Sequence, residues 1–313
     1  MTGFTSSSPD YLVRSELWSS QLKDVLQDEL AAQKYVDWMT EFPDGDTFTI
    51  PSIGDATVRD YTEDQSVEYD AMDTGEFQFS ITEYLSSATY ITNKAKQDSF
   101  YMNKLISTFV PKQHRAIMQR LEGDILALQT QQTASAVNSI NGADHRWVAS
   151  GTNETMALAD FAKARYSLKK ANVPDTNLIA IVDPSVEYTL NTLSNLVNVS
   201  NNAMWEGIVS TGIATGMRFV KNVYGFDVYC SNYLDDSNQT IGARTTAAGK
   251  ANMFFSASPD VLPFIGAWRQ MPKVDSEYNK DFQREEHVTT ARYGVKLYRP
   301  ENLVCVLSDT DQV

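Results

Sequence analysis

Histidine is the side chain most often used for acid–base and metal chemistry near neutral pH. The chain contains three histidines, His114, His145 and His287. None has a second histidine or a cysteine at the short spacings that hold zinc. We therefore expect each histidine to face solvent or to form a local hydrogen bond.

The two cysteines, Cys230 and Cys305, each lie in an apolar stretch typical of a strand. Such positions favour buried free thiols. Two distant cysteines without a Cys-x-x-Cys pair provide no disulfide framework. This cysteine usage fits a chain that folds in a reducing cytoplasm.

Motifs for nucleophilic catalysis and nucleotide binding are absent: there is no Gly-x-Ser-x-Gly elbow, no phosphate-binding P-loop and no Gly-x-Gly-x-x-Gly turn. A Ser–His–Asp group assembled from distant segments stays open, because triads follow no sequence order. Asp44–Asp46 and Asp235–Asn238 could ligate a hard cation, but they lack the calcium-loop pattern. We interpret them as turn chemistry and predict no catalytic, metal or cofactor-binding residues and no cofactor.

The 313 residues include 26 basic and 40 acidic side chains, which gives a net charge of −14. Apolar residues make up 42%, so a sizeable core can form and general disorder is excluded. No apolar run approaches the roughly 18–20 residues that span a bilayer. Nucleic-acid-binding proteins usually present a basic face. The charge therefore indicates either simple solubility or a container wall that does not stick to its cargo.

The elements that would position a site begin with a polar arm, residues 1–14. A helix is expected at Ser15–Met39, with Trp18, Leu22 and Leu26 on one apolar face. We expect this face to pack on another chain or under a second helix.

An acidic segment lies between two stretches that alternate as strands do, Thr47–Ile50 and Phe77–Ile81. From Gly54 to Glu76 the chain has eight acidic residues and one basic residue, a charge of −7. This pattern predicts a protruding hairpin stabilised by another chain, with a disordered acidic loop as the alternative. The acidic residues expected to contact another subunit are Glu63, Asp64, Glu68 and Asp70.

The next stretch has the opposite charge, with six basic residues and one acidic residue between Lys94 and Arg120. Because Pro111 interrupts the helical pattern, we expect a new helix to begin there. It would run to about Asn138 for ~40 Å and lie with its apolar stripe on a sheet. The basic residues expected to receive the acidic hairpin of a neighbour are Lys94, Lys96, Lys104, Arg115 and Arg120.

The rest of the chain predicts an α+β fold with mostly antiparallel strands. A helix is expected at about Thr155–Ala171 and a buried strand at Asn177–Val182. A further helix would then be capped by Asp183 and opened by Pro184. The later expected strands are Arg218–Lys221, Phe226–Ser231, Met253–Ser256, Leu262–Trp268, Val288–Ala291, Val295–Tyr298 and Leu303–Leu307.

Four stretches, Phe77–Phe100, Pro111–Leu128, Ala157–Leu190 and Glu285–Leu307, follow one another in a familiar order. The chain resembles the major capsid proteins of tailed double-stranded DNA bacteriophages with the Hong Kong 97-like fold. The first stretch looks like the return of the extended loop and the second like the spine helix. The third resembles the entry into the axial domain, and the fourth resembles the closing strands, with Gly294 in their turn.

The resemblance implies a non-enzymatic structural protein that self-assembles as pentamers and hexamers into an icosahedral shell. The shell would enclose double-stranded DNA without sequence-specific binding to it. No membrane would be involved. It would be part of the virion capsid and be assembled in the host cytoplasm. The implied parts are an N-terminal arm (1–44), an extended loop (45–95), a peripheral domain with the spine helix (96–172), an axial domain (173–260) and return strands (261–313).

Two departures from the family narrow this expectation. Some members join subunits through a lysine on the extended loop, but this chain has no lysine between Phe48 and Glu83. We therefore expect noncovalent contacts. Some members begin with a long scaffolding region, whereas the arm-like helix here begins by Ser15. We expect a separate scaffolding protein and a portal as partners, with a cement protein left open.

Two alternatives stay open from sequence. One is an encapsulin-type compartment of the same fold, which would hold protein cargo in place of DNA. The other is a cytoplasmic enzyme whose acidic segment is an active-site lid, which predicts a small oligomer with a deep polar pocket.

Overall fold

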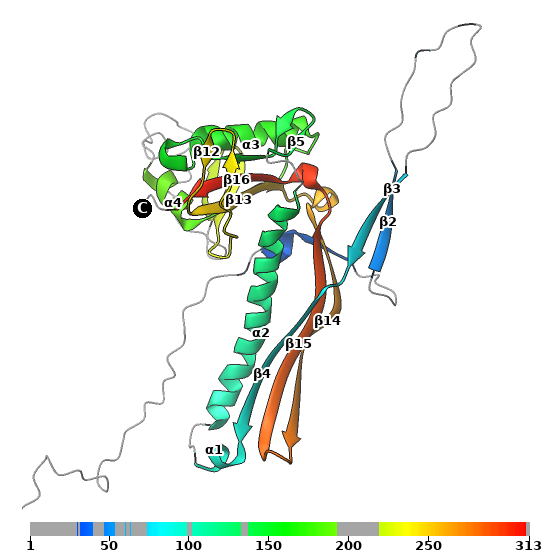
Figure 1. The fold of residues 1–313 in the computed structure, drawn as a ribbon, viewed down its shortest axis with the longest axis vertical. Helices are drawn as coiled ribbons and strands as arrows, with labels where there is room; N and C mark the ends of the chain where they lie inside the picture. Colours follow the sequence, from blue (N-terminus) through cyan, green and yellow to red (C-terminus); the bar gives the residue numbers. More distant parts are fainter. Residues whose placement is uncertain are drawn as a thin grey trace, which may run out of the picture.

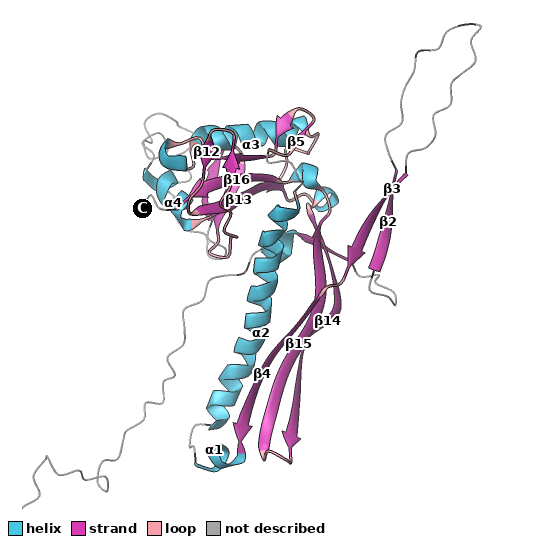
Figure 2. Cartoon of the chain, viewed as in Figure 1, coloured by secondary structure: helices cyan, strands magenta, loops and turns pink. Residues whose placement is uncertain are grey.

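The computed structural model has three parts: a long helix lying along a ribbon of strands, a compact sheet domain at one end, and a projecting hairpin (Figures 1 and 2). None of the described helices is both long and apolar enough to cross a membrane. The structure describes residues 30, 32–39, 47–53, 60, 63, 74–98, 102–132, 137–192 and 219–310.

The longest helix is α2, whose 26 residues extend for about 39 Å. Pro111 lies inside it, so the prediction that a helix begins at Pro111 and ends near Asn138 is wrong. A proline removes one helical hydrogen bond, and the packing of α2 along β4 and β15 outweighs that loss. The helices are α1 (Asn93–Asp98), α2 (Met102–Ala127), α3 (Leu158–Lys170) and α4 (Pro184–Thr192), with 3-10 helices at Ala32–Tyr35, Leu128–Gln131, Thr152–Glu154, Pro259–Val261 and Pro300–Asn302.

A four-stranded sheet in the order β1-β14-β15-β4 lies beside α2 (Figure 1). Strand β1 is parallel to β14, and the other pairs are antiparallel. We call β4, β15 and β14 the ribbon, because they extend together far beyond β1. The strands are β1 (Val36–Met39), β4 (Glu83–Thr92), β14 (Phe264–Asn279) and β15 (Arg284–Leu297).

The ribbon strands are longer than the sequence pattern predicted. The expected strands Val288–Ala291 and Val295–Tyr298 merge into one strand, β15, which ends at Leu297. Gly294 therefore lies inside β15, paired with Ala267, and its expected place in a turn is wrong. The distal part of β14 is exposed on both faces, so it lacks the alternation that marks a half-buried strand.

The end of the expected helix Ser15–Met39 is a strand, because Val36–Met39 pairs with β14. The preceding 3-10 helix is held by Glu122 of α2, whose buried carboxylate oxygens accept the backbone N–H of Ala32 at 2.9 and 3.0 Å. The first 29 residues, including Trp18, Leu22 and Leu26, lie outside the described residues.

The second sheet has six strands in the order β7-β16-β13-β8-β10-β9. Helices α3 and α4 share one core with it, in which Phe254 packs edge-on against Phe161 and Phe226. The Asp183 cap is confirmed, since its carboxylate accepts the N–H of Ser185 at 2.9 Å. The strands are β7 (Arg146–Val148), β8 (Leu178–Val182), β9 (Phe219–Val223), β10 (Phe226–Cys230), β13 (Gly249–Ser256) and β16 (Val304–Asp309).

The hairpin of β2 and β3 confirms the two strands expected on either side of the acidic segment. Phe79 and Ile81 anchor its base in a small core with Ile265 and Ala267. The hairpin then projects away from the ribbon (Figure 1). The remaining strands are β2 (Thr47–Ile53), β3 (Thr74–Ser80), β5 (Ser139–Ile140), β6 (Ala143–Asp144), β11 (Thr240–Ile241) and β12 (Arg244–Thr245).

Two glycines in different backbone settings give opposite expectations for stability. At Gly294 a Cβ would lie 2.7 Å from the Ser80 carbonyl oxygen, whereas at Gly123 in α2 nothing lies within 4 Å. Gly294→Ala should lower the free energy of unfolding by about 1–3 kcal/mol, because the added methyl group overpacks the base of the hairpin at the end of β3. Gly123→Ala should raise it by about 0.5–1 kcal/mol because alanine favours helix. Urea unfolding of the soluble subunits measures both, and effects of the same sign would contradict this packing.

Candidate intersubunit surfaces

The proximal half of α2, toward the six-stranded sheet, is fixed to the ribbon by apolar packing and one strong hydrogen bond. Leu121 and Ile125 are fully buried in the core that contains Tyr293. The Tyr293 hydroxyl donates to Asp124 at 2.6 Å, and Arg120 pairs with the same carboxylate at 3.0 Å. Burial, and then the Asp124 carboxylate, raise the pKa of Tyr293, so its hydroxyl stays protonated as a donor.

Polar contacts also join the helices to the ribbon beyond this core. The Thr289 hydroxyl donates to buried Gln113 at 3.2 Å. Lys96 of α1 forms an ion pair with Glu285 of β15. Among the described side chains, hydrogen-bonded and charged groups thus connect α1 and α2 with the distal part of β15.

The basic residues expected as a docking patch come from two helices. Lys94 and Lys96 belong to α1, whereas Arg115 and Arg120 lie on later turns of α2. Lys96 and Arg120 already have acidic partners within the chain. Lys104 belongs to α2, but its side chain is outside the described part of the chain.

Of the acidic residues expected to contact a neighbour, Glu63 is described and is exposed. Asp64, Glu68 and Asp70 lie outside the described residues. The contact between the acidic and basic sets therefore stays a prediction.

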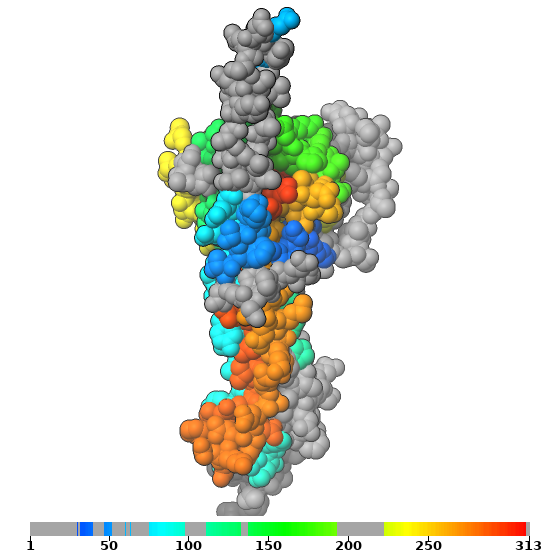
Figure 3. Space-filling model, turned by 90° about the vertical axis from the view of Figure 1, so that its right-hand side faces the viewer, coloured from blue at the N-terminus to red at the C-terminus, as the bar shows by residue number. Residues whose placement is uncertain are grey.

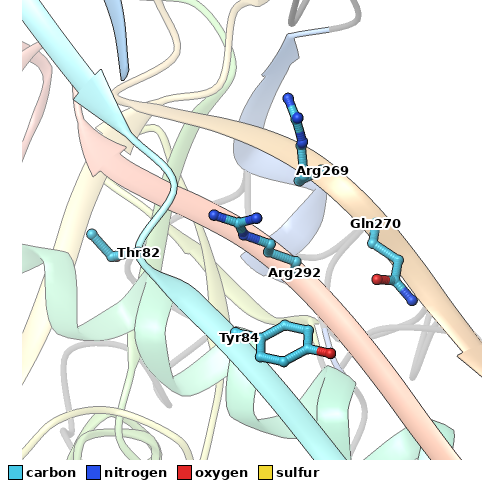
Figure 4. A pocket seen from close by; sticks show the side chains of 5 residues that line it. All are labelled: Thr82, Tyr84, Arg269, Gln270 and Arg292. Carbon is cyan, nitrogen blue, oxygen red and sulfur yellow. The ribbon is translucent and has the colours of Figure 1, made fainter. Parts of the chain in front are cut away.

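The structure brings together a polar cluster that sequence analysis missed. A hollow of about 620 Å³ opens in the ribbon (Figure 4) and is lined by Thr82, Tyr84, Arg269, Gln270 and Arg292. Tyr84 and Gln270 are both cross-strand partners of Arg292, on its two sides. The hollow therefore crosses all three ribbon strands.

A bulge supplies the second arginine of this hollow. Trp268 pairs with Tyr293 and Gln270 pairs with Arg292, which leaves Arg269 as an extra residue in β14. Bulges of this kind redirect a side chain. Neither the pairing register nor the bulge can be recognised from residue spacing, because the two arginines are 23 positions apart.

A buried polar network joins the end of α2 to the six-stranded sheet. The Arg146 guanidinium donates to Gln129 Oε1 at 2.6 Å and to Gln239 Oε1 at 2.8 Å. Gln129 in turn donates to Asp235 at 3.2 Å. Because buried polar groups are costly unless they are paired, this network fixes the junction between helix and sheet.

Two of the side chains that could perform chemistry, Cys305 and His145, are buried. Burial raises the pKa of the Cys305 thiol to about 11, which keeps it protonated. Burial also lowers the pKa of His145, whose Nδ1 lies 3.0 Å from the Ala143 carbonyl oxygen. His114 is exposed on α2. Within the described ranges, no group of three or more histidine, cysteine or acidic side chains could hold a metal.

Residues of the acidic turn Asp235–Asn238 form an ion pair and a hydrogen bond within the chain. Asp236 pairs with Lys250, and the Asn238 side chain accepts the N–H of Gly249 at 2.8 Å. Asp44–Asp46 lies outside the described residues.

These parts define the fold class: a long helix on a strand ribbon, a compact sheet domain and a projecting hairpin form the Hong Kong 97-like capsid fold. The chain is similar to one from Mycobacterium phage Che8, at 17% identity and TM-score 0.69, covering 94% of this chain and 97% of that one. It is similar to a chain in the capsid structure of cyanophage P-SCSP1u, at 13% identity and TM-score 0.71, covering 95% and 93%. A chain of the cyanophage Pam1 capsid matches at 13% identity and TM-score 0.70 over 100% of both chains.

The sequence profile of the phage capsid protein family matches residues 74–306, and the chain belongs to this family as a capsid shell protein. The match includes the return strand of the hairpin, α2 and most of both sheets. No curated protein matches the chain by sequence.

An ion-pair cluster on the sheet domain gives a prediction for pH dependence. Hydrogen bonds from Arg165, and then from Lys169, hold the pKa of Asp175 at about 2, below its ordinary 3.8. A depressed carboxylate pKa stabilises the folded state above the unfolded pKa, and this stability is lost as the pH falls through the folded pKa. Asp175→Asn should therefore be less stable than wild type at pH 5–7, with the gap closing between about pH 4 and pH 2.

Thermal unfolding of the soluble subunits across this pH range measures the gap. Asp260→Asn, at an exposed aspartate of a 3-10 helix, is the matched control. A gap that does not change with pH would contradict the role of the Asp175 charge.

Proposed function

We propose that this capsid shell protein is the major subunit of a tailed-phage head and forms pentamers and hexamers. These capsomers would close into an icosahedral shell around double-stranded DNA. The observation that carries the proposal is the family match over residues 74–306, which spans the helix, the ribbon and the sheet domain as one unit. In this arrangement α2 and the ribbon are the peripheral domain, and the six-stranded sheet with α3 and α4 is the axial domain.

The domain ranges expected from sequence are adjusted on two points. Helix α3 and strand β7 share one core with the six-stranded sheet, so we assign them to the axial domain and not to a peripheral range of 96–172. Strand β4 belongs to the ribbon, so we assign it to the peripheral domain and not to the extended loop of 45–95. The arm (1–44), the axial range from 173 to 260 and the return strands (261–313) are kept in the proposal.

The net charge and the composition support a shell that does not bind DNA tightly and whose subunits are held by noncovalent contacts. A net charge of −14 opposes binding of DNA to the protein as a whole. The stretch between Phe48 and Glu83 has no lysine for a loop crosslink. We assign the protein no enzymatic step, and we propose assembly in the host cytoplasm with a separate scaffolding protein and a portal, with or without a cement protein.

The protein-compartment and lid-enzyme alternatives gain no support from the comparisons, in which the matching family is a phage capsid family. Subunit contacts in the proposal come from the acidic segment of the hairpin and from the predicted arm helix.

Electron microscopy of the expressed protein tests the shell proposal directly. Negatively stained samples, with the scaffolding protein co-expressed where needed, should contain rings of five and six subunits or closed shells. A uniform monomer or small oligomer under every assembly condition would exclude the proposal. Protein cargo in the shells would favour the compartment.

Removal of the arm tests its role in closure. Deleting residues 1–29 keeps Ala32 and β1, which the core needs, but removes the predicted stripe of Trp18, Leu22 and Leu26. We expect folded subunits that assemble into few or no closed shells, because each subunit loses an apolar contact with its neighbour.

Deleting only residues 1–14 is the control, since it leaves that stripe in place. Sedimentation and microscopy compare the yields of closed particles. Equal yields from both deletions would show that the stripe has no part in assembly.

A further inference from the structure

A two-residue turn, Asn141-Gly142, joins β5 to β6 in the sheet domain. Ile140 pairs with Ala143 across the turn, and both turn residues have positive φ, 50° for Asn141 and 77° for Gly142. Positive φ at both positions defines the hairpin turn that asparagine followed by glycine forms most readily. Both residues are exposed. The pair therefore suits the turn, but it also brings together two residues that can react with each other.

Asparagine deamidates most readily when glycine follows it, because glycine has no Cβ to hinder the reaction. The backbone nitrogen of Gly142 would attack the side-chain carbon Cγ of Asn141, and ammonia would leave as a succinimide ring closes. Water then opens the ring at either carbonyl group and gives aspartate or isoaspartate. The net change is the uptake of one water molecule and the loss of one ammonia. Asn141-Gly142 is the single Asn-Gly pair of the sequence.

The β5–β6 hairpin is fastened to α3, beside which it lies (Figure 1). The Asn141 side-chain amide donates to the Lys170 carbonyl oxygen at 3.3 Å. The Ser167 hydroxyl donates to the Asp144 carbonyl oxygen at 2.6 Å, and Lys163 pairs with the Asp144 carboxylate at 3.5 Å. In Figure 3 a green surface of the sheet domain, the colour of α3, faces the viewer. These contacts hold the hairpin against the last turns of the helix.

The Asn141 amide acts as a cap for α3. Lys170 is the last residue of this helix, and the final carbonyl groups of a helix lack partners within it. Asn141 supplies a donor to one of them from 29 positions away. The same hydrogen bond restrains the amide that deamidation consumes. The contact therefore slows the reaction, and it is lost once the reaction has occurred.

We propose that Asn141 is a site of spontaneous deamidation, at which conversion to aspartate or isoaspartate releases the β5–β6 hairpin from α3. The carboxylate product cannot donate to the Lys170 carbonyl oxygen, and it places a negative charge at the negative end of the helix dipole. Isoaspartate also adds a backbone carbon to a turn of only two residues. Modified subunits accumulate with age, because no step restores the amide. This inference needs only the folded subunit and does not rest on the proposed function.

Mass spectrometry of purified full-length subunits tests the reaction. The subunits are incubated at mildly alkaline pH, and tryptic peptides are sequenced at increasing times. Asn141 should show the mass increase that replaces an amide by a carboxylic acid, several times faster than at mildly acidic pH, because the attacking nitrogen must lose its proton. Protein isoaspartate O-methyltransferase should label the aged subunits.

A synthetic peptide of residues 137–146 provides the unrestrained reference. The folded subunit should react more slowly than this peptide, because the contacts with α3 restrain the turn. Complete conversion of the peptide without any mass change in the subunit would overturn the proposal.

Two asparagines of the same molecule are internal controls. Asn153 and Asn172 are also exposed and have positive φ, but a residue with a Cβ follows each of them. They should stay unmodified over the time in which most of Asn141 is converted. Equal conversion of all three would show that the Asn-Gly turn has no special part.

Ser167→Ala tests the restraint by α3. Without the Ser167 hydroxyl the hairpin should open more often, and Asn141 should deamidate several times faster than in wild type. Ser86→Ala, at an exposed serine of β4, is the matched control. Circular dichroism checks that each variant is folded, and Lys163→Ala, which removes the ion pair with Asp144, serves if Ser167→Ala is not. Equal rates in the two serine variants would contradict the restraint.

Hydrogen exchange measures the release of the hairpin. In aged subunits, residues 139–144 and the last turn of α3 should exchange faster than in fresh subunits. Asn141→Asp introduces the carboxylate without the extra backbone carbon, so it should reproduce part of this change and lower the midpoint of thermal unfolding. Unchanged exchange in both segments of fully deamidated subunits would overturn the proposed release.

Discussion

The buried C-terminal half of α2 is the constraint on which the rest of the molecule depends. Leu121 and Ile125 have no exposed surface, and they share one core with Tyr293 of the ribbon and Met253 of the six-stranded sheet. The C-terminal end of α2 thus packs in a core that both sheets share. The Arg146 network adds directional hydrogen bonds at the same junction. Apolar burial and paired polar groups together fix how the elongated body meets the compact domain.

The charges of the chain are separated by this architecture. Ion pairs such as Lys96–Glu285 join α1 to the ribbon, so part of the basic charge is used within the subunit. The acidic charge is concentrated in the sequence between β2 and β3, the two strands of the projecting hairpin (Figure 1). Arg269 and Arg292 are placed on the face that α2 leaves open. The fold therefore places much of the acidic charge and these two arginines on different elements.

Local signals in the sequence predicted the elements that depend on local physics. The strands on both sides of the acidic segment follow from alternation, and the cap at Asp183 follows from the Asp-Pro pair. Pro111 was misleading because long-range packing against the ribbon overrides its local cost. The distal part of β14 gave no alternating pattern, since neither of its faces is covered. The arginine hollow could not be predicted, because it depends on cross-strand register and on a bulge.

The order of strands in the two sheets has a consequence for how the protein forms during synthesis. Strand β16, near the end of the chain, lies between β7 and β13, while β14 and β15 lie between β1 and β4. Neither sheet can close until these late segments have left the ribosome. Until then the apolar residues of α2 have no ribbon to cover them. Pairings between segments so distant in sequence form slowly, and exposed apolar surface favours aggregation in the meantime. The core is thus completed only after β14, β15 and β16 have been synthesised, and apolar surface of the nascent chain stays exposed until then.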